Sequence, residues 1–361
     1  MSFNLYSDFF KVRSVMFGGD ATALEKEYAA TVDRYIEKRT EPRDLTYLYI
    51  KISNYCNSDC EYCAHAVSRA GTEQKHDIPM PLIQKALDGA VELNAQAVVF
   101  SGGEPLLREE LYEGISFCRD HGIVPVVLTN GTLLDKTWER LGDAGLRYVI
   151  MSVDSVDPQV YEKHRGISFQ KALDGIDAAV KMMEKYKGTE VNVSAVLERD
   201  NFDGFMQLVR FMNERNIKVQ VCPLHDFFRI DDRPLPGERE KITAFAEQLI
   251  AYKRAGGLIA SSEAFIRHLP AYFCDNQPSP EGFVCKIGYN SLSIDANMNV
   301  RCCWDSTFEP LGNLSEHTLP EIWHGEKMRG YRQRMLRRQC GGCWFMCTSE
   351  NTLLIDHYGT D

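Results

Sequence analysis

The chain has 361 residues, of which 44% are hydrophobic and 25% charged, and its formal net charge is −10. This composition is typical of a globular protein, and the acidic balance argues against a surface that coats nucleic acid. Residues 1–20 lack a basic segment followed by an apolar one, and no apolar run reaches the roughly 18–20 residues of a membrane span. We therefore expect a cytoplasmic protein whose 12 cysteines are reduced and bind metal, take part in redox chemistry or pack in the core.

Residues 22–38 carry apolar side chains at helical spacing, which predicts a helical N-terminal extension over 1–44. From residue 46 onward, short apolar segments alternate with amphipathic ones. The predicted strands are 46–53, 97–101, 124–129, 148–153, 190–197 and 219–223. The predicted helices are 81–93, 106–121, 134–144, 169–185, 201–215 and 237–253. This alternation predicts an α/β fold with a parallel sheet, and six units rather than eight predict a partial (β/α)6 TIM-like barrel over 45–256.

The pattern changes in the last third of the chain. Residues 270–282 predict a loop, and residues 290–295 and 299–304 predict the two strands of a hairpin. Residues 318–338 predict one helix, rich in lysine and arginine. We therefore expect a small C-terminal domain over 257–361.

Three cysteines follow the first predicted strand at a C-x3-C-x2-C spacing: Cys56, Cys60 and Cys63. Three thiolates on one short loop can hold three irons of a cubane cluster and leave the fourth iron open, as catalysis requires. The alternative is a structural zinc site, with His65 or His76 nearby as a fourth ligand. The loop lies at the C-terminal end of a barrel strand, where barrel enzymes place their active sites, and this favours the open cluster.

The three cysteines, with the aromatic Tyr62 before the last of them, resemble the signature of radical S-adenosylmethionine (radical SAM) enzymes. The resemblance implies a [4Fe-4S] cluster whose open iron chelates the amino and carboxylate groups of SAM. It further implies that an electron from the cluster cleaves the sulfonium, and that the 5′-deoxyadenosyl radical so formed abstracts a hydrogen atom from substrate. A reducing partner such as flavodoxin or ferredoxin must then dock, and the basic segment 327–338 offers a patch for it.

Polar segments at the ends of the next strands occur in the order that this family shows. Ser101-Gly102-Gly103-Glu104-Pro105 follows the second strand, and its glycines let backbone approach a ligand closely. By resemblance, the residues expected to contact SAM are Tyr62, Gly102, Gly103, Glu104, Asn130, Ser152 and Asp154. His225, after the sixth strand, could approach the adenine, although a core or solvated histidine is the alternative.

Six further cysteines lie in the C-terminal region, which resembles the SPASM/twitch extension of radical SAM enzymes. The full SPASM form uses seven or eight cysteines for two auxiliary clusters, so six favour the twitch form with one auxiliary [4Fe-4S] cluster. Where the family has a glycine in the hairpin turn, this chain has Met298. The expected auxiliary ligands are Cys285, Cys303, Cys340 and Cys343, with Cys347 or Cys302 as possible substitutes.

The resemblance implies a radical SAM oxidoreductase of dehydrogenase type, acting in natural product biosynthesis. The 44 residues before the barrel are too few for the leader-binding domain of many peptide-modifying members. We therefore expect a small substrate, a sugar-like or aminocyclitol metabolite, with neither nucleic acid nor membrane as partner. The alternatives are a maturase of a ribosomally made peptide and, more remotely, a zinc-binding protein without catalysis.

Overall fold

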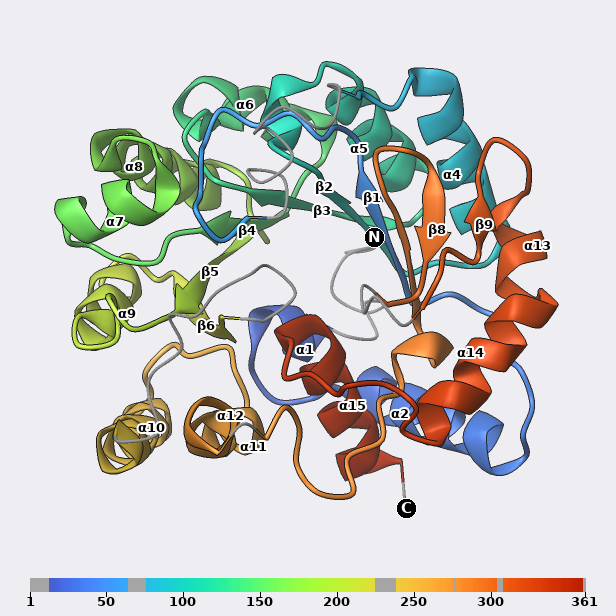
Figure 1. Cartoon of the computed structure of the whole chain (residues 1–361). Coiled ribbons are helices and arrows are strands. Elements are labelled where there is room, and N and C mark those ends of the chain that lie inside the picture. The colour runs from blue at the N-terminus through green and yellow to red at the C-terminus, as the bar shows by residue number, and fades with distance from the viewer. Residues whose placement is uncertain (1–12, 64–75, 225–237, 276, 304–307, 360–361) are drawn as a thin grey trace.

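The structure, a computed structural model, describes residues 13–63, 76–224, 238–275, 277–303 and 308–359. One sheet of nine strands runs through this part of the chain in the order β6-β5-β4-β3-β2-β1-β7-β8-β9. Strands β1 to β6 pair in parallel and curve into an open barrel with helices outside (Figure 1). They are β1 Tyr47–Lys51, β2 Ala97–Ser101, β3 Val124–Thr129, β4 Tyr148–Ser152, β5 Glu190–Leu197 and β6 Lys218–Pro223. The predicted partial barrel is thus confirmed.

In the described part of the chain, each barrel strand is followed by a helix that covers the outside of the sheet (Figure 1). These helices are α4 Met80–Glu92, α5 Glu110–Asp120, α6 Leu134–Ala144, α8 Phe169–Lys185, α9 Phe205–Asn213 and α10 Arg239–Arg254. Strands covered on both faces are apolar along their whole length, as in β2, where the first four residues are buried. The helix predicted at 106–121 divides into the short 3-10 helix Pro105–Leu107 and α5, because the segment between them turns away at Arg108.

A short helix that hydrophobic spacing did not predict, α7 (Pro158–Arg165), lies between β4 and α8. The side chain of Asp157 caps its first turn by accepting hydrogen bonds from the backbone of Gln159 and Val160. Gly166 ends the helix in the left-handed region at φ +60°. An Asp-Pro start and a glycine stop are the signals that could have found it.

The predicted hairpin is confirmed as β7 (Ser291–Ile294) and β8 (Asn299–Arg301), and β9 (Gly312–Asn313) pairs with β8. Met298 adopts the left-handed conformation in the turn, at φ +66°, where the family has glycine. Strand β7 also pairs in parallel with β1, so the barrel sheet continues into the predicted C-terminal domain.

Two predictions in this region were wrong in detail. The predicted loop 270–282 begins inside the helix α12 (Leu269–Cys274), whose apolar side chains are buried, just after the short α11 (Glu263–Arg267). The predicted helix 318–338 is two helices, α13 (Leu319–Trp323) and α14 (Glu326–Leu336). Gly325 separates them because its backbone is extended, at φ −73° and ψ 161°.

The C-terminal helix α15 (Met346–Tyr358) fills the open side of the barrel, between β6 and β1 (Figure 1). It packs against α1 (Arg13–Phe17), α2 (Ala23–Glu37), α11 and β6. The hydroxyl of Tyr47 on β1 donates a hydrogen bond to the carbonyl oxygen of Cys347 at 3.2 Å. Four of the buried side chains of α15 are polar, so this helix shows no apolar stripe and the sequence did not predict it. No helix in the described ranges is long and apolar enough to cross a membrane.

Glu350 of α15 makes the stability of this closure depend on pH. Burial raises the pKa of its carboxyl from 4.5 to about 7, while its hydrogen bond from the backbone of Ser262 opposes the rise. The folded chain therefore holds a proton that the unfolded chain has released, so this contribution to stability falls as the pH rises from about 4.5 to about 7. We expect Glu350→Gln to raise the melting temperature relative to wild type at about pH 8 but not at about pH 5. Glu247 is exposed, so the control variant Glu247→Gln should not raise the melting temperature relative to wild type at about pH 8.

Candidate functional site

The three cysteines of the first motif lie on the loop that leaves the C-terminal end of β1. Cys60 is buried, and Cys56 and Cys63 are half-buried. The loop backbone is held by the end of α7, since the backbone N–H of Asp59 donates to the carbonyl oxygen of Arg165 at 3.0 Å. Burial raises the pKa of the Cys60 thiol, while the Arg165 guanidinium acts in the opposite direction.

The two glycines after β2 form the close contact that holds this loop. The backbone N–H groups of Gly103 and Glu104 donate to the carbonyl oxygens of Ser53 and Tyr55, both at 2.8 Å. A Cβ at Gly103 would lie 2.1 Å from the Tyr55 oxygen, and a Cβ at Gly102 would lie 2.4 Å from the Ser53 oxygen. The chain that these glycines approach closely is the segment entering the cysteine loop, and their contact with SAM stays a prediction.

Glu104 and Asn130 join the same network. The fully buried carboxylate of Glu104 accepts hydrogen bonds from the Thr129 hydroxyl at 2.7 Å and the Asn130 backbone at 2.8 Å. Burial raises its pKa to about 7. The side-chain amide of Asn130 donates to Asn57 Oδ1 at 2.8 Å and lies 3.7 Å from Cys56 Sγ. Both residues were expected to contact SAM, and in the structure their polar groups hold the cysteine loop in place.

Asp154, also expected to contact SAM, forms a buried ion pair. Its carboxylate has no exposed surface and accepts from Arg165 Nε at 2.6 Å and Arg165 Nη2 at 2.7 Å. The backbone of Val196 donates to it at 2.8 Å, and the hydroxyl of Tyr62 donates a short hydrogen bond. Arg165 Nη1 lies 3.8 Å from Cys60 Sγ. Asp154 therefore positions Arg165 against the cysteine, and Tyr62 donates to the same carboxylate. Ser152 lies half-buried at the end of β4.

Sequence reasoning missed the residues that α7 contributes. Besides Arg165, His164 is buried there, with Nδ1 2.7 Å from Glu61 Oε1 and 3.0 Å from Glu198 Oε1. Burial raises the pKa of Glu198 to about 8. These side chains were missed because the helix that carries them was missed. His65 and His225, which the sequence raised as candidates, lie outside the described residues.

Four cysteines of the second set line a cavity of about 550 Å³. Its lining includes all four expected auxiliary ligands: Cys285, Cys303, Cys340 and Cys343. Burial first, and then the neighbouring thiol of Cys343, raises the pKa of Cys285 well above its usual value. Cys302 and Cys347 do not line this cavity; Cys302 is buried and Cys347 is half-buried.

Both sets fit iron–sulfur clusters by donor chemistry. Four thiols facing one cavity match the four thiolate ligands of a closed cluster. Three thiols on one loop, of which Cys56 and Cys60 have side-chain N–H groups near their sulfur atoms, match an open one. Among the residues that the structure describes, no three cysteine, histidine, aspartate or glutamate side chains are grouped so as to hold a single metal ion.

Family models identify both halves of this arrangement. The radical SAM superfamily model matches residues 50–212, and the SPASM iron-sulfur cluster-binding domain model matches residues 285–344. The chain therefore contains a radical SAM domain followed by a SPASM domain, the arrangement of radical SAM enzymes of the SPASM/twitch subgroup. These two domains imply a SAM-binding [4Fe-4S] cluster and an auxiliary iron–sulfur cluster.

Individual relatives differ in how much of the chain they share. GTP 3',8-cyclase from Alkaliphilus oremlandii is 32% identical over 171 residues, 46% of this chain and 53% of that protein. The chain thus spans about half the length of such relatives. PqqA peptide cyclase from Xanthomonas oryzae pv. oryzae is 26% identical over 317 residues, 84% of this chain and 81% of that protein. Among solved structures, Streptococcus suis SuiB bound to its precursor peptide SuiA has the same fold, with a TM-score of 0.64, 18% identity, and coverage of 87% of this chain and 73% of that chain.

Proposed function

We propose that this protein is a radical SAM enzyme that modifies a ribosomally made peptide. The observation that carries the proposal is the match to PqqA peptide cyclase, which extends over 84% of this chain and 81% of that protein. The matches to GTP 3',8-cyclases stop at about half of each chain. The fold of SuiB, crystallised with its precursor peptide, supports the same proposal. These relatives favour a peptide over the sugar-like metabolite that the sequence favoured.

We assign the SAM-binding cluster to Cys56, Cys60 and Cys63, and the auxiliary cluster to the four cysteines of the 550 Å³ cavity. When bound, the first cluster and SAM supply the radical that removes a hydrogen atom from substrate. The protein's part is to hold the cysteine loop and to donate N–H groups to its sulfur atoms. The side-chain amide of Asn130 donates to the sulfur of Cys56, and the guanidinium of Arg165 donates to the sulfur of Cys60. All of the residues expected to contact SAM remain proposed SAM contacts: Tyr62, Gly102, Gly103, Glu104, Asn130, Ser152 and Asp154.

Arg165 should affect both stability and redox chemistry. Replacing it with methionine leaves the Asp154 carboxylate buried without its cation, which typically costs about 3–5 kcal/mol. We expect Arg165→Met to lose stability on that scale in urea unfolding, and Asp154→Asn combined with Arg165→Met to recover part of the loss. Both variants should lower the midpoint potential of the first cluster, because a positive donor near its sulfur stabilises the reduced state. An unchanged potential in both variants would show that Arg165 does not act on the cluster.

The function is tested by anaerobic incubation with SAM, a reductant and short peptides encoded beside the gene. We expect one peptide to accelerate 5′-deoxyadenosine release and to change in mass by the loss of hydrogen atoms. The same assay should include GTP and aminocyclitols. Turnover with one of these and with no peptide would contradict the proposal.

A further inference from the structure

A second cavity, of about 330 Å³, lies between α14 and the segment that follows α2. Thr40 and Glu41 approach it from the chain that leads into β1, and Tyr289 approaches it just before β7. Because β1 and β7 are parallel, this cavity lies toward the edge where both strands begin, opposite the edge that carries the cysteine loop. It shares no lining residue with the auxiliary-cluster cavity.

Arg332 of α14 forms the buried wall of this cavity. Its side chain is 3% exposed, its Nε donates to the carbonyl oxygen of Gly288 at 2.8 Å, and its guanidinium lies 4.3 Å from the ring centre of Trp323. Both terminal nitrogens, Nη1 and Nη2, are buried without a hydrogen-bond partner. Burial lowers its pKa to about 10, so it remains protonated at neutral pH. A buried charged donor without a partner is costly, and a ligand that accepts its protons relieves that cost.

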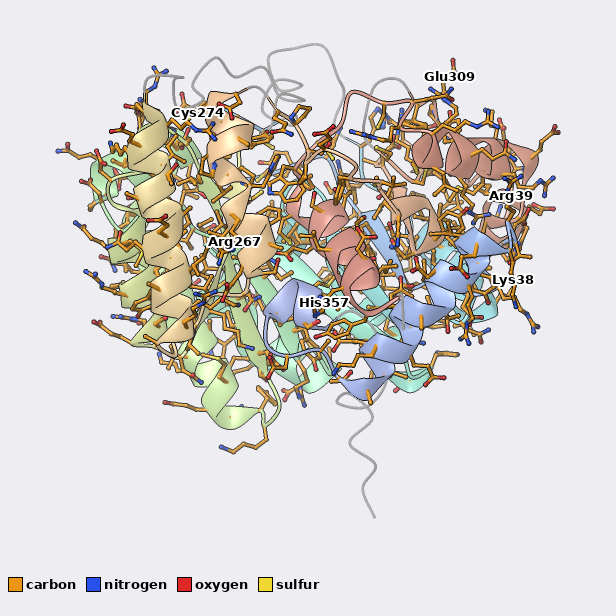
Figure 2. All side chains as sticks on the ribbon, turned by 90° about the horizontal axis from the view of Figure 1, so that it is seen from below. Lys38, Arg39, Arg267, Cys274, Glu309 and His357 are labelled. Carbon is orange, nitrogen blue, oxygen red and sulfur yellow. The ribbon has the colours of Figure 1, made fainter. Side chains whose placement is uncertain are left out.

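The rest of the lining adds positive charge. Arg39, Arg329 and Arg337 line the cavity with Arg332, whereas Glu41 is the one carboxylate among the lining residues. The carboxylate of Glu41 already pairs with one of these arginines, because its Oε1 lies 3.3 Å from Arg329 Nη1. Four guanidinium groups and one carboxylate leave an excess of three positive charges on a chain whose net charge is −10. Figure 2 shows Arg39 at the end of α2, on the side of the molecule where α14 lies.

We infer that this cavity, the Arg332 cavity, binds an oxyanion, either a phosphate or a carboxylate group. The two unpartnered terminal nitrogens of one guanidinium match two oxygens of such a group in bidentate geometry. The rim arginines neutralise the remaining charge, and a volume of about 330 Å³ is within the range of small-ligand sites. The inference does not depend on the proposed function, because the cavity lies at a different edge of the sheet and its test measures ligand binding rather than catalysis.

The test uses the full-length, cluster-reconstituted protein and isothermal titration with two probes, inorganic phosphate and glutarate, at constant ionic strength in potassium chloride. We expect saturable binding of at least one probe and a rise in melting temperature with its concentration. Arg332→Gln should abolish binding, and Arg337→Gln, at the exposed rim, should weaken it by about tenfold, as for the loss of one charged hydrogen bond. Lys327→Gln removes a positive charge from the same helix outside the cavity and should leave binding unchanged.

The outcomes separate the two sources of the oxyanion. Tighter binding of phosphate identifies a phosphorylated ligand, and tighter binding of glutarate identifies a carboxylate. Absence of saturable binding for both probes would overturn the inference, as would equal affinities in Arg337→Gln and Lys327→Gln. Because Arg337 is exposed, its variant keeps the test decisive even if Arg332→Gln does not fold.

Discussion

The double variant Cys340→Ala/Cys343→Ala is expected to lower iron from about eight to about four atoms per chain, since each cubane holds four. Both cysteines line the 550 Å³ cavity, whose lining includes none of Cys56, Cys60 and Cys63. The remaining iron should therefore belong to the first cluster, and SAM cleavage under reductant should persist. Peptide modification should stop. Anaerobic iron and sulfide quantitation, with 5′-deoxyadenosine measured in parallel, checks each of these outcomes.

A matched pair of cysteine variants controls for the loss of thiols as such. Neither Cys302, which is buried, nor Cys347, which is half-buried, lines the cavity. Cys302→Ala and Cys347→Ala should keep about eight irons per chain. Loss of iron in Cys347→Ala, or an unchanged iron content in the Cys340/Cys343 variant, would contradict the ligand assignment.

Gly103→Ala should have the opposite effect on the two clusters, removing the first and keeping the auxiliary one. Its new Cβ would lie 2.1 Å from the carbonyl oxygen of Tyr55 and 2.8 Å from the backbone nitrogen of Cys56. Both contacts are with backbone atoms. The clash therefore cannot be relieved by moving the end of a side chain, and the loop itself must move. We expect the first cluster and SAM cleavage to be lost while about four irons remain at the auxiliary site.

Gly330 provides the control for this substitution. It lies on α14, and a Cβ built there meets no atom within 4 Å. Gly330→Ala should keep both clusters and full SAM cleavage. If Gly103→Ala retained about eight irons and normal cleavage, the close contact with the cysteine loop would not be needed to hold the cluster.

Sequence reasoning predicted the barrel and both cysteine sets because their signals are local. A buried parallel strand such as β3 is a continuous apolar run, and cysteine spacing along one loop is visible without a fold. The four cysteines proposed as auxiliary ligands come from three distant segments, and all four line one cavity.

The rest could not be predicted, because it depends on contacts between segments far apart in the chain. Asp154 pairs with Arg165 on a helix too short and polar to show hydrophobic spacing. α15 buries polar residues such as Asn351, so its packing against the barrel leaves no periodic pattern. The oxygens of Glu104 accept from Thr129 and Asn130, which resemblance to a ligand motif does not reveal.

The most direct test of the peptide-modifying function is the fate of the abstracted hydrogen. A deuterated form of the peptide that supports turnover would be incubated anaerobically with the enzyme, SAM and reductant, and the released 5′-deoxyadenosine analysed by mass spectrometry. We predict that deuterium from the peptide appears in 5′-deoxyadenosine, with a matching loss of deuterium from the product peptide. 5′-Deoxyadenosine free of deuterium, beside an unchanged peptide, would contradict the proposed function.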